Sequence, residues 1–267
     1  MRTLRRSSLA LAVTVALGSS LHAQSARKPA RKPVRRPAAS SRVADSARVM
    51  IESAALAGDL SRLIAARTLL DKSLRARPND ALLLHYRGYA QYRMANLRNG
   101  VTGTAELIAD LTAARESLER SIAARPMPES YLLLASVEQR LAGLDPAHAA
   151  ALDAAAQRHI EKGTTIGESN PRVFLLAGIS ALYTPTQLGG GDHAAEQLIN
   201  HAITLYRTDH PAPPAPGWGE GEAYAWLGQV YQRTSRKDKA LAAYRHALML
   251  EPKFAWVKDV LIPRLGK

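Results

Sequence analysis

The residues that could do chemistry are few in this chain, and their spacing favours no metal site. His193 lies three residues before Glu196, and His201 follows eight residues after His193, which would suit part of a zinc site. The histidine spacing found in zinc enzymes and a third ligand are both missing, so solvated histidines on a capped helix are the favoured interpretation. We therefore predict no metal.

Two other local patterns have simpler explanations than catalysis. Gly189-Gly190-Gly191 precedes an expected helix, but no strand and no phosphate-loop motif accompany it, so a turn is preferred. Asp192 and Glu196 form a carboxylate pair, yet acidic residues at a helix start are stabilised by the helix dipole. The serine motif Gly-x-Ser-x-Gly is absent, and so is cysteine, which excludes disulfides and thiolate chemistry. We predict a non-enzyme without a cofactor.

The stretch from Ala223 to Pro252 is the most regular part of the chain. If it reverses at the polar turn Thr234–Asp238, two antiparallel helices bring small residues face to face, and larger side chains fill the seam. Pro252 then ends the second helix near Leu250, because proline restricts the residue before it. The predicted packing residues of this hairpin are Leu227, Gly228, Tyr231, Ala240, Tyr244, Ala247 and Pro252.

The order and spacing of these residues resemble the tetratricopeptide repeat, with Tyr224 where tryptophan is usual and Tyr244 where phenylalanine is usual. Since one hairpin cannot bury its apolar face alone, further copies should precede it. Upstream packing positions are Gly88, Ala114, Gly178 and Ala195. The resemblance implies an all-α fold, an α-α superhelix (a TPR-like solenoid) over residues 43–267, with about five helical hairpins and a C-terminal capping helix.

The copies are irregular in places. Residues 96–110 form an insertion with Thr104 as the expected N-cap of a longer helix, and residues 184–192 form a turn with Asp192 as an N-cap. A helix over residues 147–162 belongs to the third copy, but its register stays open. The capping helix is expected over residues 254–262, before Pro263.

The N-terminal residues indicate export. Residues 1–23 resemble a signal peptide, with basic residues, an apolar run too short to span a bilayer and a small residue, Ala23, at the cleavage point. The alternative is an uncleaved anchor. Residues 24–42 are basic and proline-rich and are predicted to be a disordered linker. The expected location is periplasmic or secreted, and the cleaved chain is not transmembrane.

Charge is concentrated in the same part of the chain. Ten of the 36 basic residues lie within residues 1–42, which contain no acidic residue, and the remaining 26 exceed the 23 acidic residues by three. The linker could therefore contact an anionic cell-envelope surface, although a solvated spacer is preferred and nucleic acid is an unlikely partner for an exported chain.

In tetratricopeptide arrays the first helix of each pair lines a concave groove. The repeat register set by the glycines indicates which residues of this sequence occupy the groove positions. By resemblance, the groove positions are His85, Tyr89, Tyr92, Arg93, Arg140, Arg172, Tyr183, Glu222, Gln229, Gln232 and Arg233. Tyrosine, arginine and glutamine suit a peptide or an acidic ligand, while ordinary wet surface is the alternative interpretation.

Two functions follow from different classes. The leading hypothesis is an exported scaffold or adaptor that binds a protein or peptide in the groove. The alternative is a periplasmic helper that binds a small molecule or lipid beside a transport system, with the insertions at residues 96–110 and 184–192 closing a cavity.

Overall fold

The structure, a computed structural model, describes residues 39–98 and 104–266. These residues form helices, turns and connecting segments, and none of them is in a strand. The predicted signal peptide and most of the predicted linker lie outside the described residues. The all-α prediction is confirmed for the residues that the structure describes.

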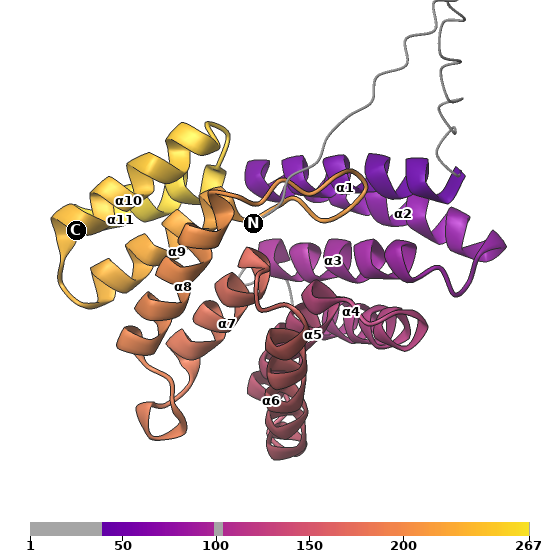
Figure 1. The fold of residues 1–267 in the computed structure, drawn as a ribbon, viewed down its shortest axis with the longest axis horizontal. Helices are drawn as coiled ribbons and strands as arrows, with labels where there is room; N and C mark the ends of the chain where they lie inside the picture. Colours follow the sequence, from indigo (N-terminus) through magenta and orange to yellow (C-terminus); the bar gives the residue numbers. More distant parts are fainter. Residues whose placement is uncertain (1–38, 99–103, 267) are drawn as a thin grey trace, which may run out of the picture. The chain divides into compact units, whose positions relative to one another are not determined.

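Helices adjacent in sequence pair into five hairpins (Figure 1). The pairs are α1 (Ala39–Ala57) with α2 (Leu60–Ala76), α3 (Ala81–Arg98) with α4 (Thr104–Ala124), α5 (Pro128–Leu144) with α6 (Ala149–Ile166), α7 (Pro171–Tyr183) with α8 (Asp192–Tyr206), and α9 (Glu220–Arg233) with α10 (Lys237–Leu250). A 3-10 turn, η1 (Thr186–Leu188), joins α7 to α8. The π-helical η2 (Trp256–Leu261) and α11 (Ile262–Leu265) follow the last hairpin, in the place expected for the cap.

Glycines allow the helices of three hairpins to approach closely. A methyl group added at Gly88 would lie 2.6 Å from Leu118 Cγ, and one at Gly178 would lie 2.6 Å from Ile199 Cγ1. At Gly228 the added carbon would lie 2.2 Å from the ring of Tyr244. These distances are shorter than van der Waals contact, so any larger residue would require the facing side chain or its helix to shift.

The third hairpin has its own small residues, and they settle the register that the sequence left open. Ala240 and Ala247 lie seven residues apart on the buried side of α10. Ala156 and Gly163 have the same spacing on the buried side of α6. A methyl group at Gly163 would lie 2.1 Å from Leu132 Cδ2 on α5, so Gly163 is the close-contact position. The helix extends to Ile166, past the predicted end at residue 162, so Gly163 lies within it.

Several predicted boundaries differ from the structure. The helical part begins at Ala39, four residues before the predicted boundary at Val43. Gly191, with φ 95°, occupies the N-cap of α8, and Asp192 is the first helical residue, with its carboxylate directed to a later arginine. Pro263 lies in α11, which continues directly from the π-helical η2, rather than ending a helix.

The first helices of the hairpins form an inner layer. Contacts link α1 to α3, α3 to α5, α5 to α7 and α7 to α9, while the second helices pack outside them. We call the side of α3, α5, α7 and α9 that carries the predicted groove residues the inner face. The α6 helix packs on α5 and has few contacts with α7 (Figure 1). One buried apolar cluster extends from α1 to α9.

The first hairpin also touches the C-terminal helices. Leu56 on α1 packs against the second apolar cluster, which contains Tyr244, Phe254 and Val257. A methyl group at Gly58 would be 3.9 Å from the Cβ of Ala255. The hairpins at the two ends of the described array are therefore in contact.

Candidate functional site

The predicted groove residues divide into two sets that lie in different surroundings. Buried members are His85, Tyr89, Arg172 and Glu222, and Arg93 is bound to two of them. Tyr92 is nearly buried but borders the second set, which includes Arg140, Tyr183 and Arg233. The difference between the two sets comes from a segment of the chain itself.

Residues Asp209–Gly219, which we call the strap, connect α8 to α9 and cross the inner face (Figure 1). The Tyr86 hydroxyl donates to the Pro214 carbonyl at 2.5 Å, and the Gly217 N–H donates to Glu52 Oε1 at 3.4 Å. The strap therefore bonds to α3 and to α1, which lie more than 120 residues earlier in the chain.

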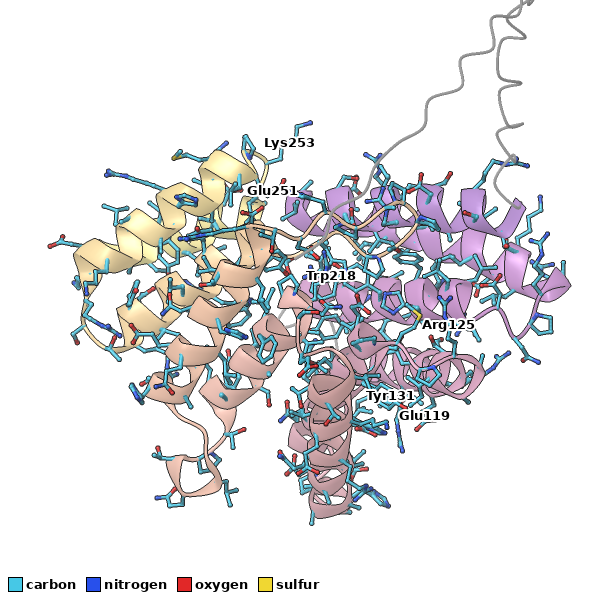
Figure 2. All side chains as sticks on the ribbon, viewed as in Figure 1. Glu119, Arg125, Tyr131, Trp218, Glu251 and Lys253 are labelled. Atoms are coloured by element: carbon cyan, nitrogen blue, oxygen red, sulfur yellow. The ribbon has the colours of Figure 1, made fainter. Side chains whose placement is uncertain are left out.

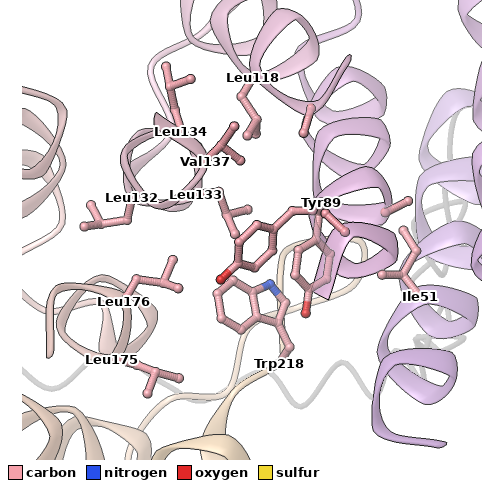
Figure 3. Packing of buried hydrophobic residues seen from close by; sticks show 14 of the residues in the cluster. Ile51, Tyr89, Leu118, Leu132, Leu133, Leu134, Val137, Leu175, Leu176 and Trp218 are labelled. Atoms are coloured by element: carbon pink, nitrogen blue, oxygen red, sulfur yellow. The ribbon is translucent and has the colours of Figure 1, made fainter. Parts of the chain in front are cut away.

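Trp218 is the strap residue with the largest buried side chain. Its ring stacks on Tyr89 with the centroids 5.0 Å apart, among the leucines of α5 and α7 (Figure 3). The Arg93 guanidinium lies 5.0 Å from the Tyr89 centroid and 5.8 Å from that of Trp218, and it forms an ion pair with Glu222. The indole is 6% exposed, although its Nε1 has no partner among the described residues. Figure 2 labels Trp218 near the middle of the view.

Arg172 lies at the Asp209 end of the strap. Its guanidinium forms an ion pair with Asp209 at the start of the strap and lies 5.8 Å from the centroid of Tyr206. The side chain is 2% exposed. Tyr206 in turn donates its hydroxyl to the Trp218 carbonyl at 3.1 Å. We call the surface beneath the strap, formed by Glu52, Tyr86, Tyr89, Arg172 and Tyr206, the covered region.

His85 lies beside this region inside the protein. Its Nδ1 is 2.8 Å from Ser130 Oγ, and Ser130 is 3.2 Å from Ser121, which donates to the Ala81 carbonyl. Since Ser121 uses its proton on that carbonyl, Ser130 donates to Ser121 and accepts from the N–H of Nδ1. Nδ1 therefore carries a proton, and because burial lowers the pKa of His85 to about 3, the ring is neutral and Nε2, which has no partner among the described residues, is unprotonated.

Burial changes the acidity of these groups. It lowers the pKa of His85 to about 3, with help from the charges of Arg125 and Arg172. It raises the pKa of Tyr89 well above its usual value, despite Arg93 nearby. Burial opposes the charge of Arg93, but Glu222 outweighs it and the pKa of Arg93 is raised. The charge of Arg93 is thus neutralised by a carboxylate of the protein itself.

The remaining part of the inner face is not crossed by the strap. We call it the open region, and it comprises Tyr92, Asn96, Arg140, Tyr183 and Arg233. Arg140 donates to the Asn96 side-chain oxygen and, at 3.4 Å, to the Ala95 carbonyl, both neutral acceptors. Arg233 pairs with Asp192 at 2.5 Å. Tyr183 is 71% exposed.

Electrostatic effects show that these side chains are close together. Tyr92 and Tyr183 both act on the pKa of Arg140, which burial lowers. Arg233, Tyr92 and Arg140 act on the pKa of Tyr183, which burial raises. The side chains come from α3, α5, α7 and α9, near the C-terminal end of each helix. The open region therefore has a net positive charge, because Asp192 offsets only one of its two arginines.

Gln229 and Gln232 are held against the last hairpin. The Gln229 amide donates to the Tyr244 hydroxyl at 2.6 Å, and that hydroxyl donates to Gln232 at 2.9 Å. These bonds fix both amides to α10.

A separate hollow lies between α4, α5 and α6. It has a volume of about 580 Å³ and an opening to solvent. Leu141, Leu144, Leu152 and Ile108 supply much of its apolar wall. His148 stands at its edge, with Nδ1 2.7 Å from Asp145 Oδ2, which leaves Nε2 available.

The sequence analysis did not identify Trp218 or Tyr86 as functional positions, and it assigned no role to the Pro/Gly-rich strap. The Trp218 side chain within that segment was the available signal, since an apolar ring of this size is seldom left in water. Among the described residues there is no group of three His, Asp or Glu side chains that could hold a metal ion. No helix in the described part of the chain combines the length and apolar character needed to cross a membrane.

Comparison with known proteins agrees with the repeat pattern. Residues 221–254 match the family described as tetratricopeptide repeat. No curated protein sequence matches the chain. Two solved structures share the fold, a thermophilic TPR protein from Thermus thermophilus and the HusA haemophore from Porphyromonas gingivalis.

The first of these is 21% identical, with a TM-score of 0.53 over 78% of this chain and 90% of the other. The second is 22% identical, with a TM-score of 0.54 over 74% of this chain and 95% of the other. Residues 221–254 thus match one tetratricopeptide repeat, and the described residues share the fold of the two solved structures.

Proposed function

We propose that this tetratricopeptide-repeat protein is an exported scaffold that binds an acidic segment of a protein partner on its open region. The observation that carries the proposal is the state of Arg140. Its guanidinium is partly buried, and its hydrogen-bond acceptors among the described residues are neutral oxygens. A buried charge without a counter-charge is costly, and a carboxylate from a ligand would supply the missing partner.

The surrounding side chains suit this role. Arginine presents a planar set of donors that matches a carboxylate, and the hydroxyls of Tyr92 and Tyr183 can donate to the same group. Tyr183 also offers an exposed ring for contact with the ligand's apolar parts. Tetratricopeptide scaffolds are generally non-catalytic, and we propose a binding role rather than an enzymatic one.

The test uses a fluorescein-labelled peptide of ten glutamate and glycine residues and the purified chain. We expect saturable binding that weakens as salt is raised, because salt screens the attraction between the peptide carboxylates and the positively charged open region. Arg140→Gln should weaken it about 10-fold or more, the loss expected for a charged hydrogen bond. Arg158→Gln, an exposed arginine on α6, is the matched control. Equal binding by Arg140→Gln and the parent would exclude this site.

Export is the second part of the proposal. Residues 1–23 carry the signal pattern, and the basic linker that follows could contact an anionic envelope surface. In a Gram-negative host, the chain with a C-terminal tag should be recovered from the periplasm or medium. Its mass should correspond to a first residue of Gln24. A full-length chain in the cytoplasmic fraction would contradict export, and one in the membrane fraction would favour the uncleaved anchor.

The hollow between α4, α5 and α6 favours a second candidate function, the binding of a small amphiphilic molecule. One of the proteins of similar fold is a haemophore. Here an imidazole held by a carboxylate borders an apolar hollow of about 580 Å³, an arrangement that suits an iron-bearing planar ligand. A carrier beside a transport system would fit the same observation.

Haemin is the probe for this candidate. Titration should shift the Soret absorption of haemin, and His148→Ala should abolish or weaken the shift while His210→Ala, an exposed histidine in the strap, should not. Native mass spectrometry of the chain from an envelope extract would detect a lipid or another bound molecule. A bare mass together with an unchanged haemin spectrum would exclude the candidate.

A further inference from the structure

The hollow between α4, α5 and α6 is bounded on two sides by single faces of helices. The α4 side consists of Ile108, Thr112 and Arg115, and the α6 side includes Leu152 and Ala155. Residues three or four positions apart lie above one another on a helix, so each set forms one continuous wall. The α5 helix packs against both α4 and α6, and its leucines also line the hollow. The hollow is therefore a groove between α4 and α6 with α5 at its base.

Polar side chains lie at the two ends of this groove. Arg115 is 3.9 Å from Glu138 of α5, which marks one end. Asp145, the C-cap of α5, and His148 line the other end. Glu138 and Asp145 are seven residues apart in the sequence, which corresponds to about 10 Å along a helix. The groove is therefore elongated, with apolar side chains between its polar ends.

Arg115 keeps hydrogen-bond donors that the protein does not use. Its ion pairs with Glu119, at 2.9 Å, and with Glu138, at 3.9 Å, are both closest at Nε, and neither is a hydrogen bond. Glu138 also faces His159, whose Nδ1 lies 2.7 Å from its second oxygen. Nη1 and Nη2 of Arg115 make no hydrogen bond to a described residue. The two terminal groups of an arginine match the two oxygens of a carboxylate.

We propose that this groove binds a single-chain fatty acid, with the carboxylate at Arg115 and the apolar chain along Leu141 and Leu152. The inference rests on the second candidate function, the binding of a small amphiphilic molecule, and it adds the ligand's acid group and its direction. The volume of about 580 Å³ is within the range of pockets that bury small ligands. Charge complementarity selects the acid, and the apolar walls select the chain.

Glu119 competes with such a ligand for the same guanidinium. The side chains of Arg115 and Glu119 are 40% and 46% exposed, and ion pairs of this kind contribute little energy. A ligand carboxylate held by Nη1 and Nη2 does not have to displace Glu119 from Nε, although Glu119 reduces the positive charge that attracts it. Glu119→Gln should therefore strengthen binding of the acid about 3-fold.

The probes are dansyl-undecanoic acid and its methyl ester, each added to the purified chain in a fluorescence titration. They share the apolar chain and differ in charge. We expect the parent to bind the acid about 10-fold more tightly than the ester, the difference expected for a charged hydrogen bond. Arg115→Gln should bind the two probes equally, with the affinity for the ester unchanged, which also shows that the groove is intact. Arg158→Gln, an exposed arginine elsewhere on α6, should keep the preference of the parent.

A second substitution tests where the probes bind. Ala151 lines the groove and is exposed, so Ala151→Trp should fill the space without disturbing the core. It should weaken binding of both probes about 10-fold or more, because the apolar chain loses its contact with the walls. Circular dichroism establishes that the variant remains helical. Undiminished binding by Ala151→Trp would place the probes elsewhere and overturn the proposal.

Two further results would overturn the acid site. One is equal affinity of the parent for the acid and the ester, and the other is a preference for the acid that remains in Arg115→Gln. Failure of both probes to bind would overturn this inference alone if haemin still shifts its Soret absorption, and the second candidate function as well if haemin does not. The two tests are separable because the haemin test changes His148 and leaves Arg115 in place.

Discussion

The covered and open regions lie on the same inner face and contain the same kinds of residue, yet they differ in how their charges are matched. Beneath the strap, Arg93 and Arg172 each face a carboxylate, from Glu222 and Asp209. In the open region, Arg140 faces neutral oxygens. The comparison teaches that residue type alone does not identify a binding surface. One arginine can belong to a structural ion pair, while another on the same face has no carboxylate partner.

Removing the largest buried ring should separate the two regions most clearly. Trp218→Ala should reduce the free energy of unfolding by about 4 kcal/mol, because a buried aromatic side chain is lost and a cavity remains. Tyr183→Ala in the open region should change it by no more than about 0.5 kcal/mol, since this ring is 71% exposed. Urea unfolding measures both. A Trp218→Ala cost as small as that of Tyr183→Ala would show that the strap is loosely bound.

The ion pair of the covered region should also contribute more to the free energy of unfolding than the ion pair of the open region. Asp209→Ala should cost about 3 kcal/mol, because it leaves the guanidinium of Arg172, which is 2% exposed, without its counter-charge. Asp192→Ala, which removes the partner of Arg233 in the open region, should cost about 1 kcal/mol or less, since that pair is largely exposed. Urea unfolding of the two variants and the parent supplies the comparison. Equal costs would mean that burial of Arg172 is not important to stability.

The pH dependence of stability should show the effect of burying His85, which lies beside the covered region. The unfolded chain protonates this histidine near its ordinary pKa of 6.5, whereas burial lowers the folded pKa to about 3. Between these values the unfolded state binds more protons, so stability falls as pH falls, by about 1.4 kcal/mol for each pH unit.

The difference between the parent and His85→Asn isolates this effect from the carboxyl groups. Burial raises the pKa of Glu52 and Glu251, which acts in the opposite direction but equally in both proteins. His210→Asn, in an exposed position, is the control. Parallel stability curves for the parent and His85→Asn over pH 3 to 6.5 would contradict a neutral buried imidazole.

The repeat pattern predicted the fold because hairpin packing depends on residues that are close in the sequence. Gly228 and Tyr244 belong to one hairpin, and their close contact follows from a local spacing. The third hairpin was harder, since Gly163 lies just beyond residue 162, the predicted end of its second helix.

The covered region could not be predicted in the same way, because the contacts of the strap with Tyr86 and Glu52 join residues more than 120 positions apart. A transferred groove register assumes that the groove is empty, and it therefore placed Tyr89 and Arg172 on an accessible surface. The structure instead buries both beneath the strap. The sequence signal for this burial was Trp218, a large ring in a segment made mostly of proline, alanine and glycine, because such a ring is more stable when buried.

The prediction with the smallest expected effect concerns the sign of a stability change. It tests whether replacing an arginine changes the free energy of unfolding in opposite directions in the two regions. Arg140→Met should leave the free energy of unfolding unchanged or increase it by about 1 kcal/mol or less, because an apolar chain of similar length removes a partly buried charge that has no carboxylate partner. Arg172→Met should decrease it, since Asp209 loses the group that balances it. The same substitution therefore has opposite consequences on one face. Urea unfolding and the acidic-peptide titration should be measured together, because the expected result for Arg140→Met is retained stability with lost binding. A clear loss of stability in Arg140→Met, of about 2 kcal/mol or more, would show that Arg140 is a structural residue like Arg172.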